Sequence, residues 1–127
     1  MRFAYVDTSC LVAIAFGEPG ADKVATRLRR FERLFASNLL EAELRSAAVR
    51  EGVDAGMEDL LSWITWIYPN RPLSAEFEQI TALGYLKGAD LWHLANALFL
   101  APDGKDLAFV TLDARQKQLA TRLGFSA

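Results

Sequence analysis

The sequence has little of what secreted and membrane-spanning proteins are rich in. Its 127 residues include one cysteine, Cys10, so no internal disulfide can form, and we expect a reducing, cytoplasmic location. No apolar run approaches the roughly 20 residues that span a bilayer, so we expect no contact with membranes. The first residues enter a short strand-like run without the pattern of a signal peptide, which favours the same location.

Positive charge is also not in excess. The 14 Lys and Arg residues stand against 16 Asp and Glu residues, which gives a formal net charge of −2. Nucleic-acid-binding proteins are usually basic, so this balance argues weakly against one. It does not exclude one, because local clusters matter more than the total charge, and a metal bound by some of the acids would leave the rest of the surface slightly positive.

Apolar residues are abundant, at 52% of the chain, and charged residues make up 24%. This composition is typical of a globular protein with a core of its own. The sequence contains no Gly/Ser linker, repeat or low-complexity segment. We therefore predict a single domain over residues 1–127.

Short apolar runs alternate along the chain with segments of helical periodicity. The runs predict strands over residues 3–6, 34–36 and 107–111. The periodic segments predict helices over residues 8–16, 21–31, 38–50, 54–67, 75–86, 90–100 and 113–123. Strands that alternate with helices predict an α/β protein, here a three-layer α/β/α sandwich with a central parallel sheet.

The segment 54–67 is assigned to a helix because its apolar residues recur at helical spacing. These residues are Val53, Met57, Leu60, Ile64 and Ile67. Trp66 falls off this stripe, so either the helix is buried on two sides or Trp66 belongs to a protein interface.

Four acidic residues stand at the ends of apolar runs: Asp7, Glu43, Asp90 and Asp113. Carboxylates are costly beside hydrophobic segments unless they are paired, and no matching set of Lys or Arg lies next to them in the sequence. Asp7 and Asp113 each follow a predicted strand, and sites in parallel sheets lie at the carboxyl ends of strands. Carboxylate oxygens suit Mg²⁺ and Mn²⁺, so the pattern indicates metal-dependent phosphodiester chemistry.

Three of these acids have a simpler alternative role as helix N-caps, for which Asp is a common choice. Thr8 or Ser9 could cap the helix after Asp7 equally well, which would leave Asp7 for a site. Asp90 could use one oxygen as a cap and the other for a metal. Asp113 opens the last predicted helix in the same way.

The third predicted helix contains both Glu41 and Glu43, which differ in their neighbours. Glu41 lies three residues after Asn38, as in a capping box, and four before Arg45, the favourable order for an ion pair. Glu43 has no cation within one turn. Helix stability therefore explains Glu41, whereas Glu43 is predicted to point into a shared site.

His93 is the only histidine and shares a helix face with Asp90, three residues earlier. A histidine on an apolar helix more often packs in the core or holds a metal ligand by a hydrogen bond than ligates the metal itself. We expect the second of these roles.

The densest basic stretch includes Arg27 and Arg30. It is either a solvated helix face or a contact for RNA phosphates or for an acidic partner. Arg50, two turns after Glu43, is a further candidate for a phosphate contact.

Four segments resemble, in this order and at these intervals, a PIN domain, and specifically the toxin component of VapBC-type toxin–antitoxin pairs. They are residues 5–9 (YVDTS), 37–44 (SNLLEAEL), 88–97 (GADLWHLANA) and 109–116 (FVTLDARQ). The resemblance covers nearly the whole chain. The commonest family pattern has Ala after the third acid, where this chain has Leu91 and Trp92, and this departure bears on the shape of the groove.

The resemblance implies a PIN-like α/β/α fold and a Mg²⁺- or Mn²⁺-dependent endoribonuclease that uses one or two ions and metal-activated water. The matching acids are Asp7, Glu43, Asp90 and Asp113, as catalytic residues and metal ligands. Thr111 is implied as a supporting hydroxyl, with Thr8 or Ser9 near the first acid. The resemblance also implies a homodimer and a cognate antitoxin that blocks the groove, expected on the second and fourth predicted helices with Trp66.

Two other functions are weighed against this one. The first is phosphoryl transfer by an aspartyl nucleophile, but the sequence after Asp7 lacks the second Asp two residues on, and no well-placed lysine precedes Asp113. The second is a non-catalytic binding module on the same scaffold, against which the presence of all four acids argues.

Overall fold

The computed structural model describes residues 2–53 and 56–127. In this part of the chain, four strands form one parallel sheet in the order β3-β2-β1-β4. The strands are β1 (Phe3–Val6), β2 (Arg33–Ser37), β3 (Ile64–Ile67) and β4 (Ala108–Val110). A parallel neighbour can be reached only by a crossover, so each strand is followed by helices that cover a face of the sheet.

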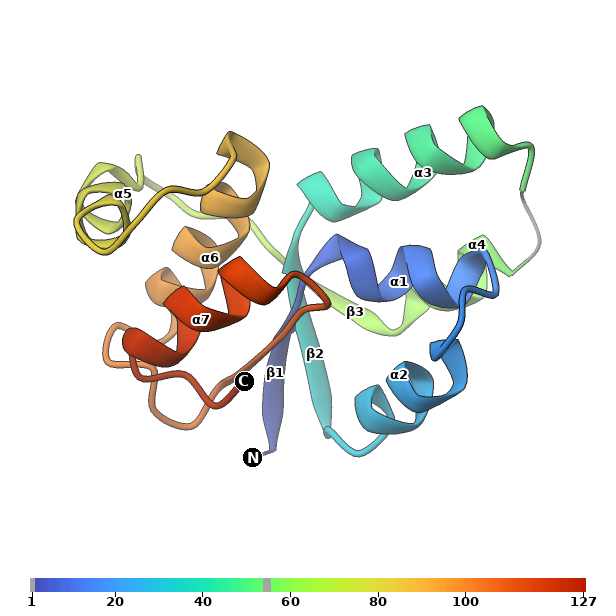
Figure 1. The fold of residues 1–127 in the computed structure, drawn as a ribbon, viewed down its shortest axis with the longest axis horizontal. Helices are drawn as coiled ribbons and strands as arrows, with labels where there is room; N and C mark the ends of the chain where they lie inside the picture. Colours follow the sequence, from blue (N-terminus) through green and yellow to red (C-terminus); the bar gives the residue numbers. More distant parts are fainter. Residues whose placement is uncertain (1, 54–55) are drawn as a thin grey trace.

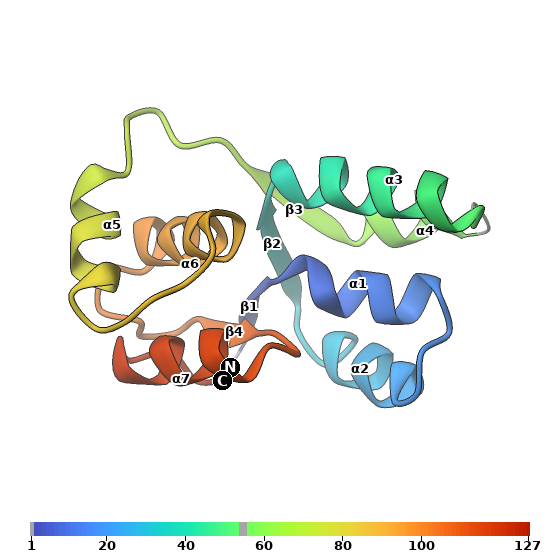
Figure 2. The same ribbon diagram turned by 45° about the horizontal axis from the view of Figure 1, so that its top comes forward.

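The helices form the two outer layers of the fold. One face of the sheet carries α1 (Thr8–Ala15), α2 (Ala21–Leu28), α3 (Leu39–Glu51) and α4 (Met57–Ser62). The other face carries α5 (Ser74–Thr81), α6 (Gly88–Leu100) and α7 (Ala114–Arg122) (Figures 1 and 2). The predicted α/β/α architecture is confirmed. Among the described helices, none is both long and apolar enough to cross a membrane.

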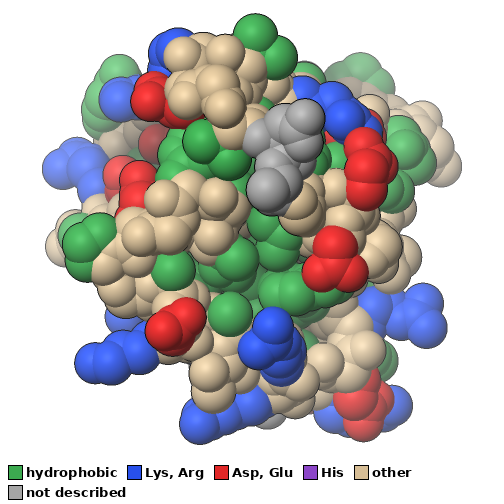
Figure 3. All heavy atoms as spheres, turned by 90° about the vertical axis from the view of Figure 1, so that its right-hand side faces the viewer, with side chains coloured by type: hydrophobic (Ala, Val, Ile, Leu, Met, Phe, Trp, Pro, Cys, Tyr) green, Lys and Arg blue, Asp and Glu red, His purple; other side chains and the backbone are tan. Residues whose placement is uncertain are grey.

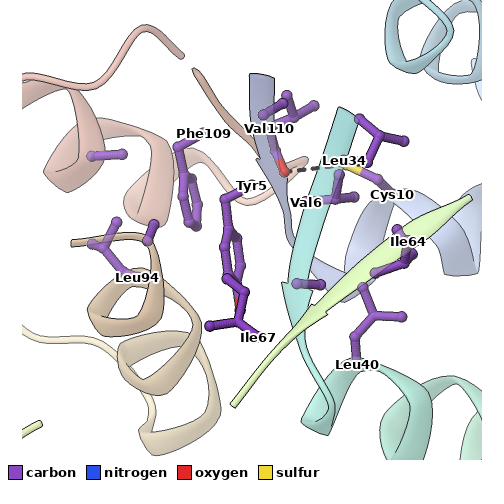
Figure 4. Close-up of a cluster of buried hydrophobic side chains, with 14 of the residues drawn as sticks. Tyr5, Val6, Cys10, Leu34, Leu40, Ile64, Ile67, Leu94, Phe109 and Val110 are labelled. Carbon is purple, nitrogen blue, oxygen red and sulfur yellow. Dashed lines mark hydrogen bonds between the residues drawn. The ribbon is translucent and has the colours of Figure 1, made fainter. Parts of the chain in front are cut away.

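The core lies on both faces of the central strand β1, as expected for a strand with helices above and below it. Tyr5 stacks on Phe109 of β4 at 5.5 Å between ring centroids, on the side of the sheet that α6 covers (Figure 4). Val6 and Leu34 lie on the opposite side, with Leu40 of α3. The residues that follow β1 are thus fixed by packing from two directions.

The predicted helix over residues 54–67 is wrong in its second half. Residues 54 and 55 lie outside the described residues, Met57–Ser62 is helical, and Ile64–Ile67 is strand β3. The four residues of β3 are β-branched or aromatic, and they pair with β2 in a way that buries Ile64 and Ile67. The free energy gained by this pairing and burial outweighs the preference that the helical spacing indicated. Trp66 is consequently part of an edge strand, and its place off a helical stripe no longer indicates an interface.

The helix predicted over residues 75–86 ends earlier, at Thr81. Two arginines of α7 stabilise the shorter form. Arg122 donates a hydrogen bond to the carbonyl of Leu83, and Arg115 donates to that of Tyr85, at 3.2 and 2.8 Å. These bonds satisfy carbonyl groups that the helix would otherwise have to pair, and they lead the chain into α6.

Candidate active site

Asp7 is the first residue after β1 and lies at the carboxyl edge of the sheet. Its backbone N–H donates to the carbonyl of Val110 at 2.9 Å, which fixes it beside the end of β4. Asp7, rather than Thr8 or Ser9, is the N-cap of α1, since its Oδ2 accepts from the Ser9 N–H at 3.2 Å. The cap does not occupy the whole carboxylate of Asp7: the residue is buried, at 4% exposure, and its oxygens have further partners.

Those partners converge on Gln116, a fully buried residue of α7. Its Nε2 donates to Asp7 Oδ1 at 3.3 Å and to the backbone carbonyl of Asp90 at 3.1 Å. Its Oε1 accepts from Thr111 Oγ1 at 2.7 Å, and the same hydroxyl lies 3.3 Å from Asp7 Oδ2. Gln116 therefore links the ends of β1 and β4 with the first turn of α6.

Asp113 is the N-cap of α7, the simpler role that its position allowed. Its Oδ1 accepts from the Gln116 N–H at 2.8 Å, while its own N–H donates to Thr111 Oγ1 at 3.0 Å. Ser9 reaches the same connection, because its Oγ accepts from the Leu112 N–H at 3.1 Å. Hydrogen bonds to Ser9 and Thr111 thus fix the backbone between the end of β4 and the start of α7.

Asp90 lies in the first turn of α6 and is not the N-cap, a position that Lys87 takes. Its pKa is raised, first by burial and then by the negative charges of Asp7 and Asp113. Asp7 and Asp113 are therefore close enough to Asp90 for their charges to disfavour its ionised form. Within residues 2–53 and 56–127, no lysine or arginine forms an ion pair with any of the three.

Glu43 of α3 belongs to a second group of side chains. Its Oε1 accepts hydrogen bonds from Thr8 Oγ1 and from His93 Nε2, each at 2.7 Å. Burial acts to raise the pKa of Glu43, but the bonds from His93 and Thr8 outweigh it, and the net effect is a lowered pKa. Glu43 is held as a carboxylate, next in space to the residue that follows Asp7.

A buried tyrosine sets the proton position on His93. Tyr5 Oη accepts from the Ser37 N–H at 3.0 Å, so its own proton is directed to His93 Nδ1, at 2.8 Å. The Nε2 of His93 then carries the hydrogen that is donated to Glu43. Burial raises the pKa of Tyr5 far above its usual range, which keeps the phenol protonated.

Sequence reasoning missed Gln116 and Tyr5, although each left a signal. Gln116 stands three residues after the N-cap Asp113, the spacing of a capping box. Tyr5 has the one polar side chain in the strand Phe3–Val6, and a buried phenol needs a hydrogen-bond partner.

The arginines proposed from the sequence as RNA contacts lie elsewhere. Arg30 follows α2 and comes just before the start of β2, at the amino edge of the sheet, whereas the acids lie at the carboxyl edge. Arg27 is half-buried on α2. Burial raises the pKa of Cys10, and Arg27 is close enough for its positive charge to oppose that effect. Arg50 pairs with Glu51 at 3.1 Å on the exposed last turn of α3. The structure does not bring these three residues to the acids.

The residues of this site suit a divalent cation. In the described part of the chain, no three His, Cys, Asp or Glu side chains are arranged to ligate an ion by themselves. Mg²⁺ does not require such a set, since it keeps several waters and is usually held by one or two carboxylates together with substrate phosphates. Burial and, after it, the negative charges of Asp7 and Asp113 raise the pKa of Asp90, and a bound cation would offset the effect of those charges.

The fold and the site together define an α/β/α domain with a carboxylate-rich centre at the carboxyl edge of its sheet. The model of the PIN domain family matches residues 4–121, and the chain belongs to that family. PIN domains are in general metal-dependent nucleases that bind RNA. No curated protein matches the chain.

Proposed function

We propose that this protein is a Mg²⁺- or Mn²⁺-dependent endoribonuclease and the toxin component of a type II toxin–antitoxin system. The observation that carries the nuclease is the gathering of Asp7, Asp90 and Asp113 around Gln116 with no paired cation among the described residues. Membership of the PIN family supports nuclease activity in general. The toxin role rests on the resemblance of four segments to VapBC-type toxins.

Each group of side chains has a part in this proposal. A divalent cation, as one or two ions, would neutralise charge on the phosphate and activate water when bound. Asp7, Glu43, Asp90 and Asp113 offer its ligands. Gln116 and Thr111 orient Asp7, while His93 and Thr8 orient Glu43 by the hydrogen bonds described above.

The geometry of Asp7 disfavours the aspartyl-phosphate alternative. A nucleophilic carboxylate needs an oxygen that can approach phosphorus. Both oxygens of Asp7 accept hydrogen bonds, and the residue is almost fully buried. Such a carboxylate is poorly placed to attack a phosphate.

The antitoxin part of the proposal has a surface that supports it. A groove of about 590 Å³ lies between α3 and α4, lined in part by Val49, Val53 and Met57. Val49 is 84% exposed, which is unusual for an aliphatic side chain. Figure 3 shows hydrophobic side chains gathered in a hollow on this face, with charged side chains around it. The proposal includes a homodimer and assigns this face to the cognate antitoxin, in place of the second predicted helix and Trp66, which were expected from the sequence.

The test is cleavage of a mixed pool of structured RNAs by the purified protein with Mn²⁺, Mg²⁺ or EDTA. The third helix offers a matched pair of variants, because Glu43 faces the site while Glu41 pairs with Arg45 on the surface at 2.7 Å. We expect discrete cuts with metal, none with EDTA, the same cuts from Glu41→Gln and none from Glu43→Gln. Cuts that persist in EDTA or in Glu43→Gln would contradict the proposal.

Metal is also expected to stabilise the fold. A cation that binds only the folded chain, and offsets the charges of Asp7 and Asp113 that act on Asp90, adds about 2.7 kcal/mol at a concentration of 100 times its Kd. Mn²⁺ or Mg²⁺ should therefore raise the melting temperature of the wild-type protein, with Ca²⁺ as a comparison for ion size. A melting temperature that none of these ions moves would count against metal binding at the acids.

A further inference from the structure

A pocket of about 640 Å³ opens at the same edge of the sheet as the acids, on the side toward β3. It lies between residues 37–39, where β2 passes into α3, residues 67–69, where β3 ends, and Trp92 of α6. Its size is within the range of pockets that bind small organic molecules. None of the site residues described above, apart from Ser37, lines it.

Two aromatic side chains form walls of the pocket. Trp92 is fixed before any ligand arrives, since its Nε1 donates to Ser37 Oγ at 2.9 Å and its ring packs against Phe77 at 6.1 Å. Tyr68 is 69% exposed on the other side.

The pocket is joined to the acids through the hydrogen bonds that hold Glu43. Ser37 contributes its side chain to Trp92 and its backbone N–H to Tyr5, which binds His93, the partner of Glu43. Leu39, which lines the pocket, precedes Glu43 by one turn on the same face of α3. A molecule in the pocket would therefore lie beside the Glu43 side of the site.

We propose that this pocket binds an unpaired base of the RNA, next to the phosphodiester bond that the acids cleave. The inference rests on the proposed nuclease function and deepens it. Single-stranded RNA is recognised through bases that stack on aromatic side chains. The amide of Asn38 at the pocket donates one hydrogen bond to Glu41 Oε1 at 3.0 Å, which leaves its second N–H and its Oδ1 for the edge of a base. No lysine or arginine is among the described residues that line the pocket, so an uncharged base suits it better than a phosphate.

The first test detects base binding without cleavage. The chain has three tryptophans, and only Trp92 lines the pocket, whereas Trp63 lines a separate one at the start of β2. Ribonucleoside 5′-monophosphates added in EDTA should shift the NMR signal of the Trp92 indole N–H and leave that of Trp63 in place. Tyr68→Ala should abolish the shift, and Tyr85→Ala, which removes an equally exposed tyrosine, should not.

The second test uses cleavage of a short unstructured RNA. Loss of one base–aromatic stack should raise the KM of Tyr68→Ala by roughly tenfold with little change in kcat, and Tyr85→Ala should behave as wild type. A Trp92 shift without any nuclease activity would uphold the pocket and refute the nuclease. Metal-dependent cleavage with no Trp92 shift and equal KM values would overturn the pocket alone. A Trp92 signal that moves only with protein concentration would assign the pocket to a protein contact and also overturn it.

Discussion

Asp90→Asn is expected to abolish metal-dependent cleavage and, in the same molecule, to raise the melting temperature of the metal-free protein. The activity should fall by at least roughly a hundredfold, the upper range for losing a group that only supports a metal ligand. The stability should rise because the substitution removes a half-buried charge that Asp7 and Asp113 repel. A change that improves the empty fold while it destroys activity is typical of a functional carboxylate.

The gain in stability should depend on pH in a definite direction. The pKa of Asp90 in the folded protein is raised, so its ionisation costs folding free energy once the pH exceeds its ordinary pKa. The difference between Asp90→Asn and wild type should therefore be largest near neutrality and should vanish below the ordinary pKa of aspartate. Thermal unfolding in EDTA across this range measures it.

Asp59→Asn is the matched control, because Asp59 is an exposed acid in the first turn of α4, away from the site. It should keep full activity and gain no stability. Full activity in Asp90→Asn would show that cleavage does not need this carboxylate. A lower melting temperature than wild type in EDTA would show that the carboxylate stabilises the fold.

Much of the fold could be predicted from the sequence because the strands and helices of a parallel α/β protein can be recognised from local patterns of apolar residues. The strand over Phe3–Val6 is a short apolar run, and the run that holds β4 is of the same kind. The edge at which Asp7 and Asp113 lie follows from the rule that parallel strands share a carboxyl edge. These features need only the order of elements, which a single sequence provides.

The segment from Met57 to Ile67 could not be assigned in the same way. Its apolar residues fit a helix by spacing, and its last four residues fit a strand by type. The choice is made by β2, which lies about thirty residues earlier and offers an edge for pairing. Local pattern contains no information about that distant edge.

The hydrogen bonds that orient the acids were also beyond sequence reasoning. Gln116 and Asp7 are 109 residues apart in the chain, and Tyr5 and His93 are 88 apart. Each pair meets only because the helices return to the sheet at particular positions. The acids themselves stood out because charge beside apolar runs is conspicuous, whereas a buried amide or phenol is ordinary until its partners are known.

Gln116→Leu is the second prediction with a large expected effect. The substitution keeps the approximate size of the side chain but removes both donors and the acceptor, so Asp7 Oδ1, Thr111 Oγ1 and the Asp90 carbonyl each lose a bond. Thr111 Oγ1 keeps its contacts with Asp7 Oδ2 and the Asp113 N–H, but Asp7 Oδ1 loses the donor described above. A buried polar group left without a partner costs roughly 1–3 kcal/mol, so the melting temperature should fall. Activity should fall by roughly 10–100-fold at saturating RNA, because the ligands lose their orientation.

Two variants separate orientation of the acids from simple loss of stability. Gln118→Leu changes an exposed glutamine of the same helix and should leave both quantities unaltered. Gln116→Glu keeps the acceptor for Thr111 but loses the N–H that holds Asp7 Oδ1. Asp7 then loses its orientation as a ligand, so the variant should need more Mn²⁺ for half-maximal cleavage than wild type. If Gln116→Leu and Gln116→Glu, assayed well below their melting temperatures, kept the wild-type kcat and metal requirement, Gln116 would stabilise the fold alone. A raised metal requirement in Gln116→Glu together with a lowered kcat in Gln116→Leu would instead identify this buried amide as the residue that holds the first acid in position for the metal.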